Sequence, residues 1–86
     1  MPRISEFYGL QVYLYYNDHE PAHFHVRYGE YHTRISIDPV RLIDGQMPRH
    51  ALNIVLEWAE IQQGALKQRW DSARARRPLD RIEPLD

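Results

Sequence analysis

Two neighbouring segments of the chain alternate between apolar and polar residues with the period of a β-strand. They read HFHVRY from His23 and YHTRISI from Tyr31, and a Gly-Glu pair separates them. Glycine at the first central position of a two-residue loop tolerates the positive φ that tight hairpins require. The pattern therefore predicts an antiparallel hairpin that bends at Gly29, with Tyr28 opposite Tyr31.

This register sorts the side chains of the hairpin onto two faces, because successive residues of a strand point to opposite sides. One face is mostly apolar and is expected to join the core: Phe24, Val26, Tyr28, Tyr31, Thr33 and Ile35. The other face collects polar and cationic residues: His23, His25, Arg27, His32, Arg34 and Ser36. A shift of one residue would mix the two sets, so their separation supports this pairing.

A further strand and a long helix are predicted on either side of the hairpin. Residues 10–16, LQVYLYY, are rich in strand-favouring residues, and Asp44-Gly45 marks another turn, around which a short fourth hairpin is possible. Apolar residues recur at helical spacing from Arg49, and Gly64 is expected to kink or divide this helix. The predicted class is α+β: a three- or four-stranded antiparallel sheet packed against a long C-terminal helix, in a single domain of residues 1–86.

The helical segment carries a second apolar stripe besides the one that can cover the sheet. It contains Ala51, Ile54, Trp58, Ile61 and Ala65. An apolar stripe needs a cover. The N-terminal residues, the C-terminal tail or a second chain could supply it, and in the last case Ile54, Trp58 and Ile61 would bind a partner protein or form a homodimer.

Composition narrows the class of protein. The 86 residues are 43% apolar and 12% aromatic, which is typical of a folded chain, and none is cysteine. A disulfide or thiolate metal site is therefore excluded. Because no apolar run approaches the roughly 20 residues that cross a bilayer, and no signal peptide is recognisable, we expect a cytoplasmic protein without a membrane segment.

Charge is distributed unevenly along the chain. Residues 67–81 contain six basic and two acidic residues, so their net charge is +4. The remaining residues carry a net charge of −5, which gives the chain its total of −1. Such a stretch could bind nucleic-acid phosphates, or it could be a solvated helix end. The candidate phosphate-binding residues are Lys67, Arg69, Arg74, Arg76 and Arg77.

The polar face of the hairpin has three interpretations. Its histidines and arginines could bind a phosphodiester and move protons near neutral pH, so RNA is a candidate substrate. Because the 2′-hydroxyl of RNA can attack the neighbouring phosphorus, cleavage would need only a base, an acid and positive charge. His25, His23, His32, Arg34 and Arg27 are the candidate catalytic residues. Alternatively, the face is merely solvated.

The third interpretation is a metal site. Histidines two apart on a strand can converge on one ion, so His23 and His25 could bind zinc together with His19. His32, across the hairpin, is the alternative third ligand. Two features of the sequence oppose this interpretation: no carboxylate is clearly placed to orient the rings, and Arg27 and Arg34 add positive charge nearby. A reaction without a cofactor is therefore preferred, with zinc as the alternative.

Several motifs together resemble one family of small bacterial and archaeal proteins. They are the opening MPRISEFYGL, the core NDHEPAHFHVRYGE, the helix PRHALNIVLEWAE and the closing IEPL. They resemble domain-of-unknown-function family 4160. The resemblance implies a small protein that is commonly encoded beside a member of family 2442, in pairs that look like toxin–antitoxin modules.

At fold level, the predicted sheet and helix are also similar to small HicA-like messenger-RNA interferase toxins. In that comparison His25 or His23 would take the catalytic place, although Glu20-Pro21-Ala22 stands where those toxins have a glycine-serine-histidine loop. We therefore expect a toxin-like or effector protein that binds or cleaves RNA through its histidine face. The alternative is a non-catalytic module that docks a partner through the second helical stripe.

Overall fold

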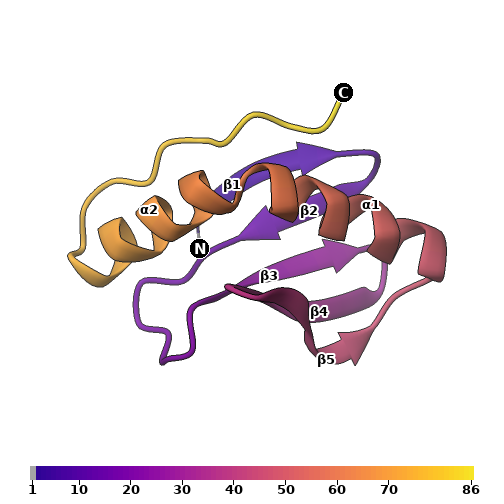
Figure 1. Cartoon of the computed structure of the whole chain (residues 1–86), viewed down its shortest axis with the longest axis horizontal. Helices are drawn as coiled ribbons and strands as arrows, with labels where there is room; N and C mark the ends of the chain where they lie inside the picture. The colour runs from indigo at the N-terminus through magenta and orange to yellow at the C-terminus, as the bar shows by residue number, and fades with distance from the viewer. Residues whose placement is uncertain (1) are drawn as a thin grey trace.

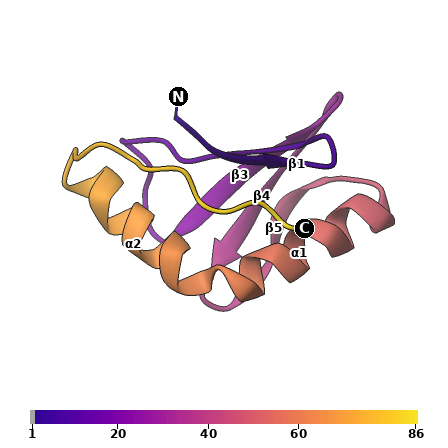
Figure 2. The ribbon, with the colours of Figure 1, turned by 90° about the horizontal axis from the view of Figure 1, so that it is seen from above.

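Five antiparallel strands form one sheet in the order in which they occur along the chain (Figure 1). The computed structural model describes residues 2–86. The elements are β1 (Arg3–Phe7), β2 (Leu10–Tyr13), β3 (His23–Tyr28), β4 (Tyr31–Ile37), β5 (Val40–Gln46), α1 (Arg49–Ile61) and α2 (Gln63–Arg74). Both helices lie on the same side of the sheet (Figure 2). The α+β class with an antiparallel sheet and C-terminal helices is thereby confirmed.

The β3–β4 hairpin has the register that the alternation predicts. Tyr28 lies opposite Tyr31, and the pairing continues outward to His23 opposite Ser36. Gly29 has a φ of +60°, as the tight bend requires. On the apolar face Phe24, Val26 and Ile35 are fully buried, so this face forms the centre of the core.

The sheet has five strands, more than the three or four predicted. β1 was not predicted, and β5 takes the place of the hairpin expected around Asp44-Gly45, so these two residues lie within a strand and not at a turn. In β1 the register shifts between Arg3 and Ser5, which breaks the simple alternation. In β5 every residue after the first is exposed, so no apolar period marks it as a strand. β2 ends at Tyr13 rather than at Tyr16, which leaves Tyr15 and its neighbours free to build a loop.

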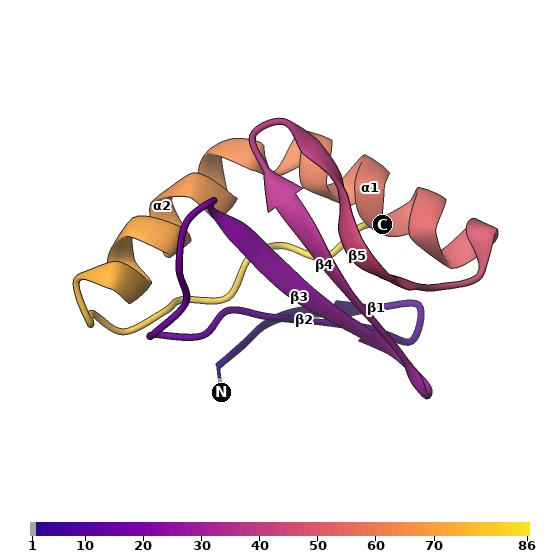
Figure 3. The same cartoon turned by 90° about the horizontal axis from the view of Figure 1, so that it is seen from below.

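The helical segment is divided into two helices rather than being one long helix (Figure 3). The division lies at Gln62, whose φ of −100° and ψ of 20° end α1 and whose backbone N–H donates to the carbonyl of Trp58. Gly64 lies inside α2, two residues beyond the break that its presence was expected to produce.

The second apolar stripe of the helices is covered within the chain. The ring of Trp58 is fully buried and lies 5.1 Å from that of Phe7 in β1, and its indole N–H donates to the carbonyl of Glu83 at 2.8 Å. The tail is fixed in turn by a 2.7 Å hydrogen bond from the Ile82 N–H to the carbonyl of Ile4. Trp58 is therefore a core residue, and the predicted partner surface of Ile54, Trp58 and Ile61 is wrong at its centre.

The two helices of the described chain, residues 49–61 and 63–74, are each too short and too polar to cross a membrane.

Candidate functional site

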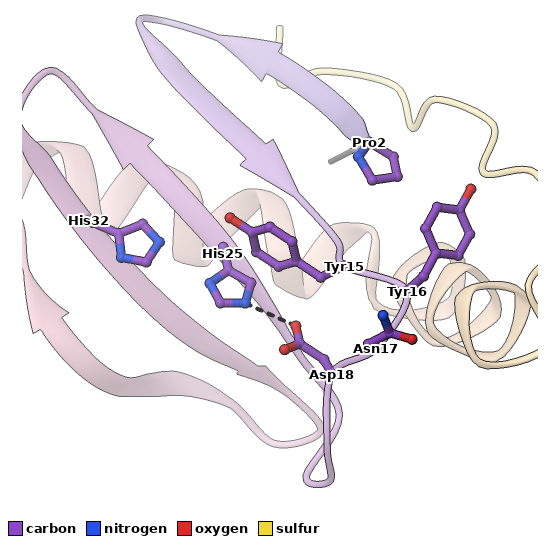
Figure 4. A pocket seen from close by; sticks show the side chains of 7 residues that line it. All are labelled: Pro2, Tyr15, Tyr16, Asn17, Asp18, His25 and His32. Atoms are coloured by element: carbon purple, nitrogen blue, oxygen red, sulfur yellow. Dashed lines mark hydrogen bonds and ion pairs between the residues drawn. The ribbon is translucent and has the colours of Figure 1, made fainter.

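An open cavity of about 510 Å³ lies where the loop after β2 passes the polar face of β3 and β4 (Figure 4). Its lining is largely aromatic and polar and consists of Pro2, Tyr15, Tyr16, Asn17, Asp18, His25 and His32. The lining comes from the N-terminal segment, the loop after β2 and the β3–β4 hairpin. The cavity therefore exists only when the loop is folded against the hairpin.

Asp18 is the residue that joins the loop to the strand. Its Oδ2 atom lies 3.0 Å from Nε2 of His25 and 3.3 Å from Nε2 of His23, so one carboxylate oxygen contacts two imidazoles. Asp18 itself is half-buried. The predicted placement of His23 and His25 on one strand face is confirmed, and the carboxylate of Asp18, which the sequence did not place, contacts both rings.

His23 is held tightly at the start of β3. Its Nδ1 atom lies 2.8 Å from the carbonyl oxygen of Pro21, its ring packs against that of Trp70 at 5.4 Å, and its side chain is 4% exposed. A carbonyl oxygen can only accept, so Nδ1 must carry the proton of this hydrogen bond. His23 is therefore buried and not accessible to solvent on the polar face.

His25 lines the floor of the cavity. Tyr15 meets its ring edge-on at 4.3 Å, and the exposed ring of His32 stacks on it at 5.4 Å with an interplanar angle of 18°. Burial lowers the pKa of His25, while the hydrogen bond and the charge of Asp18 oppose this effect. His25 therefore favours the neutral form, in which one ring nitrogen has a free lone pair.

The two arginines predicted for this face differ in their surroundings. Arg34 forms a two-pronged hydrogen bond with the carboxylate of Asp44 on β5, and this bond lowers the pKa of Asp44. Arg27 is exposed, lies across the hairpin from His32, and has no ion pair with any of residues 2–86. Of the two, only Arg27 offers a free positive charge.

The predicted phosphate-binding residues also divide into two groups. Lys67 pairs with Asp38 at 2.8 Å, and Arg69 donates to the carbonyls of Asp80 and Arg81, so both are engaged away from the cavity. At the cavity rim, Arg76 donates to the side-chain oxygen of Asn17 at 2.9 Å.

The other two predicted phosphate-binding residues are Arg74 and Arg77. Arg74 pairs with Glu20 at 3.0 Å in the loop that forms the cavity, and Arg77 is exposed. Because the partner of Arg76 is a neutral amide, the positive charge of Arg76 is not compensated by that contact.

His19, which the sequence offered as a third metal ligand, is exposed and lies outside the cluster of Asp18, His23 and His25. The cavity residues that the sequence analysis did not select are Pro2, Tyr15, Tyr16, Asn17 and Asp18. The sequence contained a usable signal for one of them, Asp18. It directly precedes His19, and its carboxylate could serve as a ligand as well as the His19 ring could. Nothing periodic in the loop indicated which of the two would point inward.

Comparisons with known proteins identify the family alone. The sequence model of the family described as "Domain of unknown function (DUF4160)" matches residues 9–71, a stretch that contains the loop, the hairpin and α1. No curated protein and no solved structure matches the chain significantly. The similarity to HicA-like toxins thus remains an expectation from the sequence.

Proposed function

This chain belongs to the DUF4160 family, whose description assigns no activity, and we propose from its site that it binds single-stranded RNA in the cavity beside β3 and β4. We further propose that it acts as the toxin-like or effector component of a bacterial two-protein module. The second proposal rests on the resemblance to family 4160, with a small family 2442-like protein as the partner. The single observation that carries the RNA proposal is an aromatic cavity bordered by uncompensated arginines.

The aromatic lining supports the binding of unpaired bases. Tyr15, Tyr16 and His32 border the cavity, and His32 is an exposed ring already stacked on His25. Proteins that bind single strands use such rings as stacking platforms, because every base has a π-face. Duplex nucleic acid is a poorer candidate, since its bases are already stacked on one another.

The charges around the cavity support a phosphate backbone as the remaining part of the ligand. Arg27 stands beside His32 on the hairpin, and Arg76 stands at the Asn17 side of the cavity. A strand crossing between them would place bases over His32 and phosphates at both ends. Because the net charge is −1, the affinity must come from these local charges and not from the molecule as a whole.

Replacing His32 with alanine is expected to weaken the binding of a fluorescein-labelled single-stranded RNA oligonucleotide by about 5-fold or more, because one stacking platform is lost. The measurement is fluorescence anisotropy at low ionic strength. His50→Ala is the matched control, since His50 is also an exposed histidine but lies at the start of α1. No RNA binding by the wild-type protein, or equal losses in the two variants, would refute the proposed site.

Replacing Arg27 with alanine is expected to weaken RNA binding and to reduce the slope of log affinity against log salt by about 1, because one phosphate contact is removed. Arg34→Ala is the control on the neighbouring strand. Its guanidinium is bound to Asp44, so the salt slope of this variant should equal that of the wild type. If Arg34→Ala reduces the slope and Arg27→Ala does not, RNA follows a different path from the one proposed.

A further inference from the structure

Three side chains beside the cavity present ligand atoms to a common point. One nitrogen or oxygen atom from each of Asp18, His23 and His25 lies within 4.8 Å of the others, and both histidines are more than nine-tenths buried. They come from two elements, the loop after β2 and the strand β3, so local sequence does not force them together. The loop is folded so that its carboxylate closes over the two rings.

The hydrogen bonding of His23 leaves one nitrogen without a partner. Because Nδ1 donates to the Pro21 carbonyl, neutral His23 has a lone pair on Nε2, which is buried and makes no hydrogen bond. Asp18 Oδ2, which also carries lone pairs, lies 3.3 Å from this nitrogen but outside hydrogen-bonding geometry. Two acceptor atoms this close in a buried site repel, and a cation bound to both removes the repulsion.

The same backbone hydrogen bond is characteristic of metal-binding histidines. A ligating imidazole almost always donates its other ring N–H to a carbonyl or carboxylate, which fixes the ring and its tautomer. His23 has this partner in Pro21. The His25 ring is held differently, by the edge of Tyr15 and the stacked ring of His32. Both rings are therefore oriented before any ligand binds.

From these observations we propose that Asp18, His23 and His25 form a binding site for a divalent transition-metal ion such as Zn²⁺. Ligand atoms about 2.1 Å from a tetrahedral ion lie about 3.4 Å apart, and the two contacts of Asp18 Oδ2 measure 3.0 and 3.3 Å. Two imidazoles and one carboxylate suit Zn²⁺ or Fe²⁺ better than Mg²⁺ or Ca²⁺, which prefer oxygen ligands.

The features of the sequence that opposed a metal site are reduced in the folded protein. Asp18 supplies a carboxylate that the sequence did not locate, and Asp44 compensates the charge of Arg34, which leaves the exposed Arg27 as the one uncompensated arginine of the two. Three protein ligands leave a fourth position of a tetrahedral ion open. Asp18 and His25 both line the cavity, so the open position faces the cavity.

The open position has a consequence for the proposed ligand. An ion there would bind a water molecule or a phosphate oxygen of a strand lying in the cavity. This consequence rests on the proposed RNA binding, whereas the binding of the ion does not. If the protein binds the ion but not RNA, the proposed function is refuted and the metal site stands. If it binds RNA but no ion, the metal site is refuted and the proposed function stands.

The test is a titration of metal-free protein, purified without a histidine tag, with Zn²⁺ followed by calorimetry and with Co²⁺ followed by visible absorption. We expect one ion per chain and the absorption of a tetrahedral Co²⁺ site. Asp18→Asn should lower the Zn²⁺ affinity by about 100-fold or more, since losing even an indirect supporting group costs 10- to 100-fold. His19→Ala is the matched control and should bind as the wild type does, because His19 lies outside the cluster.

Three results would overturn the metal site: a folded wild-type protein that binds no Zn²⁺, an Asp18→Asn variant with unchanged affinity, or a His19→Ala variant that loses the ion. In the first of these the cluster is held only by the 3.0 Å hydrogen bond between His25 Nε2 and Asp18 Oδ2. Should Asp18→Asn fail to fold, NMR of the wild-type imidazole rings decides. Zn²⁺ should then shift the signals of His23 and His25 and leave those of His19 and His50 in place.

Discussion

Trp58→Ala is expected to lower the free energy of unfolding by about 3–5 kcal/mol, the usual cost of removing a large buried aromatic side chain. The indole ring is fully buried, lies 5.1 Å from Phe7 and 6.0 Å from Phe24, and is the only ring among them that also binds the tail through Glu83. Domains typically have about 5–15 kcal/mol of stability in total. Chemical denaturation followed by circular dichroism measures the loss.

Ile61→Ala is the control on the same helix. Ile61 is 63% exposed, so its truncation should change the stability by no more than about 0.5 kcal/mol. If both variants are as stable as the wild type, the tail does not cover the helix and the Trp58 stripe is a free surface. A loss of partner binding in Trp58→Ala would reflect damage to the core, so only the exposed part of the stripe can test partner docking.

Gly45→Ala is expected to destabilise the protein by roughly 2–4 kcal/mol, through backbone strain and steric overlap together. Gly45 has a φ of +94°, which side-chain-bearing residues rarely adopt. An added Cβ would also overlap the carbonyl oxygen of His32 and lie 2.8 Å from Cα of Thr33. The strands β4 and β5 would have to separate, which a thermal denaturation midpoint would report.

Gly29→Ala separates these two causes. Gly29 has a φ of +60°, but nothing lies within 4 Å of the position that its Cβ would take. The substitution therefore carries only the cost of the left-handed conformation, about 1–2 kcal/mol. A Gly29→Ala variant at least as damaged as Gly45→Ala would show that the close approach of β5 to His32 is absent in solution.

The β4–β5 contact matters for the site as well as for stability. His32 is held on β4 opposite Gln46 of β5, and Asp44 of β5 compensates the charge of Arg34. The edge strand thus positions one ring of the cavity and neutralises Arg34, the arginine opposite His25 in the hairpin. Damage to β5 should consequently weaken RNA and metal binding together, unlike the single-residue variants of the cavity.

The hairpin and its two faces could be predicted from the sequence because both depend on local rules. A period of two, interrupted by a glycine-containing pair, permits one register, and the structure has that register from His23 to Ser36. A kink or division of the helical segment was also predicted, although the break occurs at Gln62 instead of at Gly64. A sequence can show that a helix will be interrupted, but the residue at which the helix ends depends on packing.

The edge strands could not be predicted in this way. β1 contains an irregularity between Arg3 and Ser5, and β5 has another opposite Arg34 and Ile35, so neither keeps a simple alternation. β1 is held by the tail through Ile82, a contact between the two ends of the chain. β1 also pairs with β2, but a contact with a residue more than 70 positions away has no local pattern to reveal it.

The sequence by itself determined that His23 and His25 share a strand face, because side-chain direction along a strand follows from covalent geometry. Only the tertiary structure decided which groups surround those histidines. Pro21 holds the His23 ring through a hydrogen bond, Asp18 and not His19 points inward, and Asp44 forms an ion pair with Arg34. Each of these contacts depends on how a loop or an edge strand lies against the hairpin. Such placements result from packing and burial across the whole chain, which no short-range pattern records.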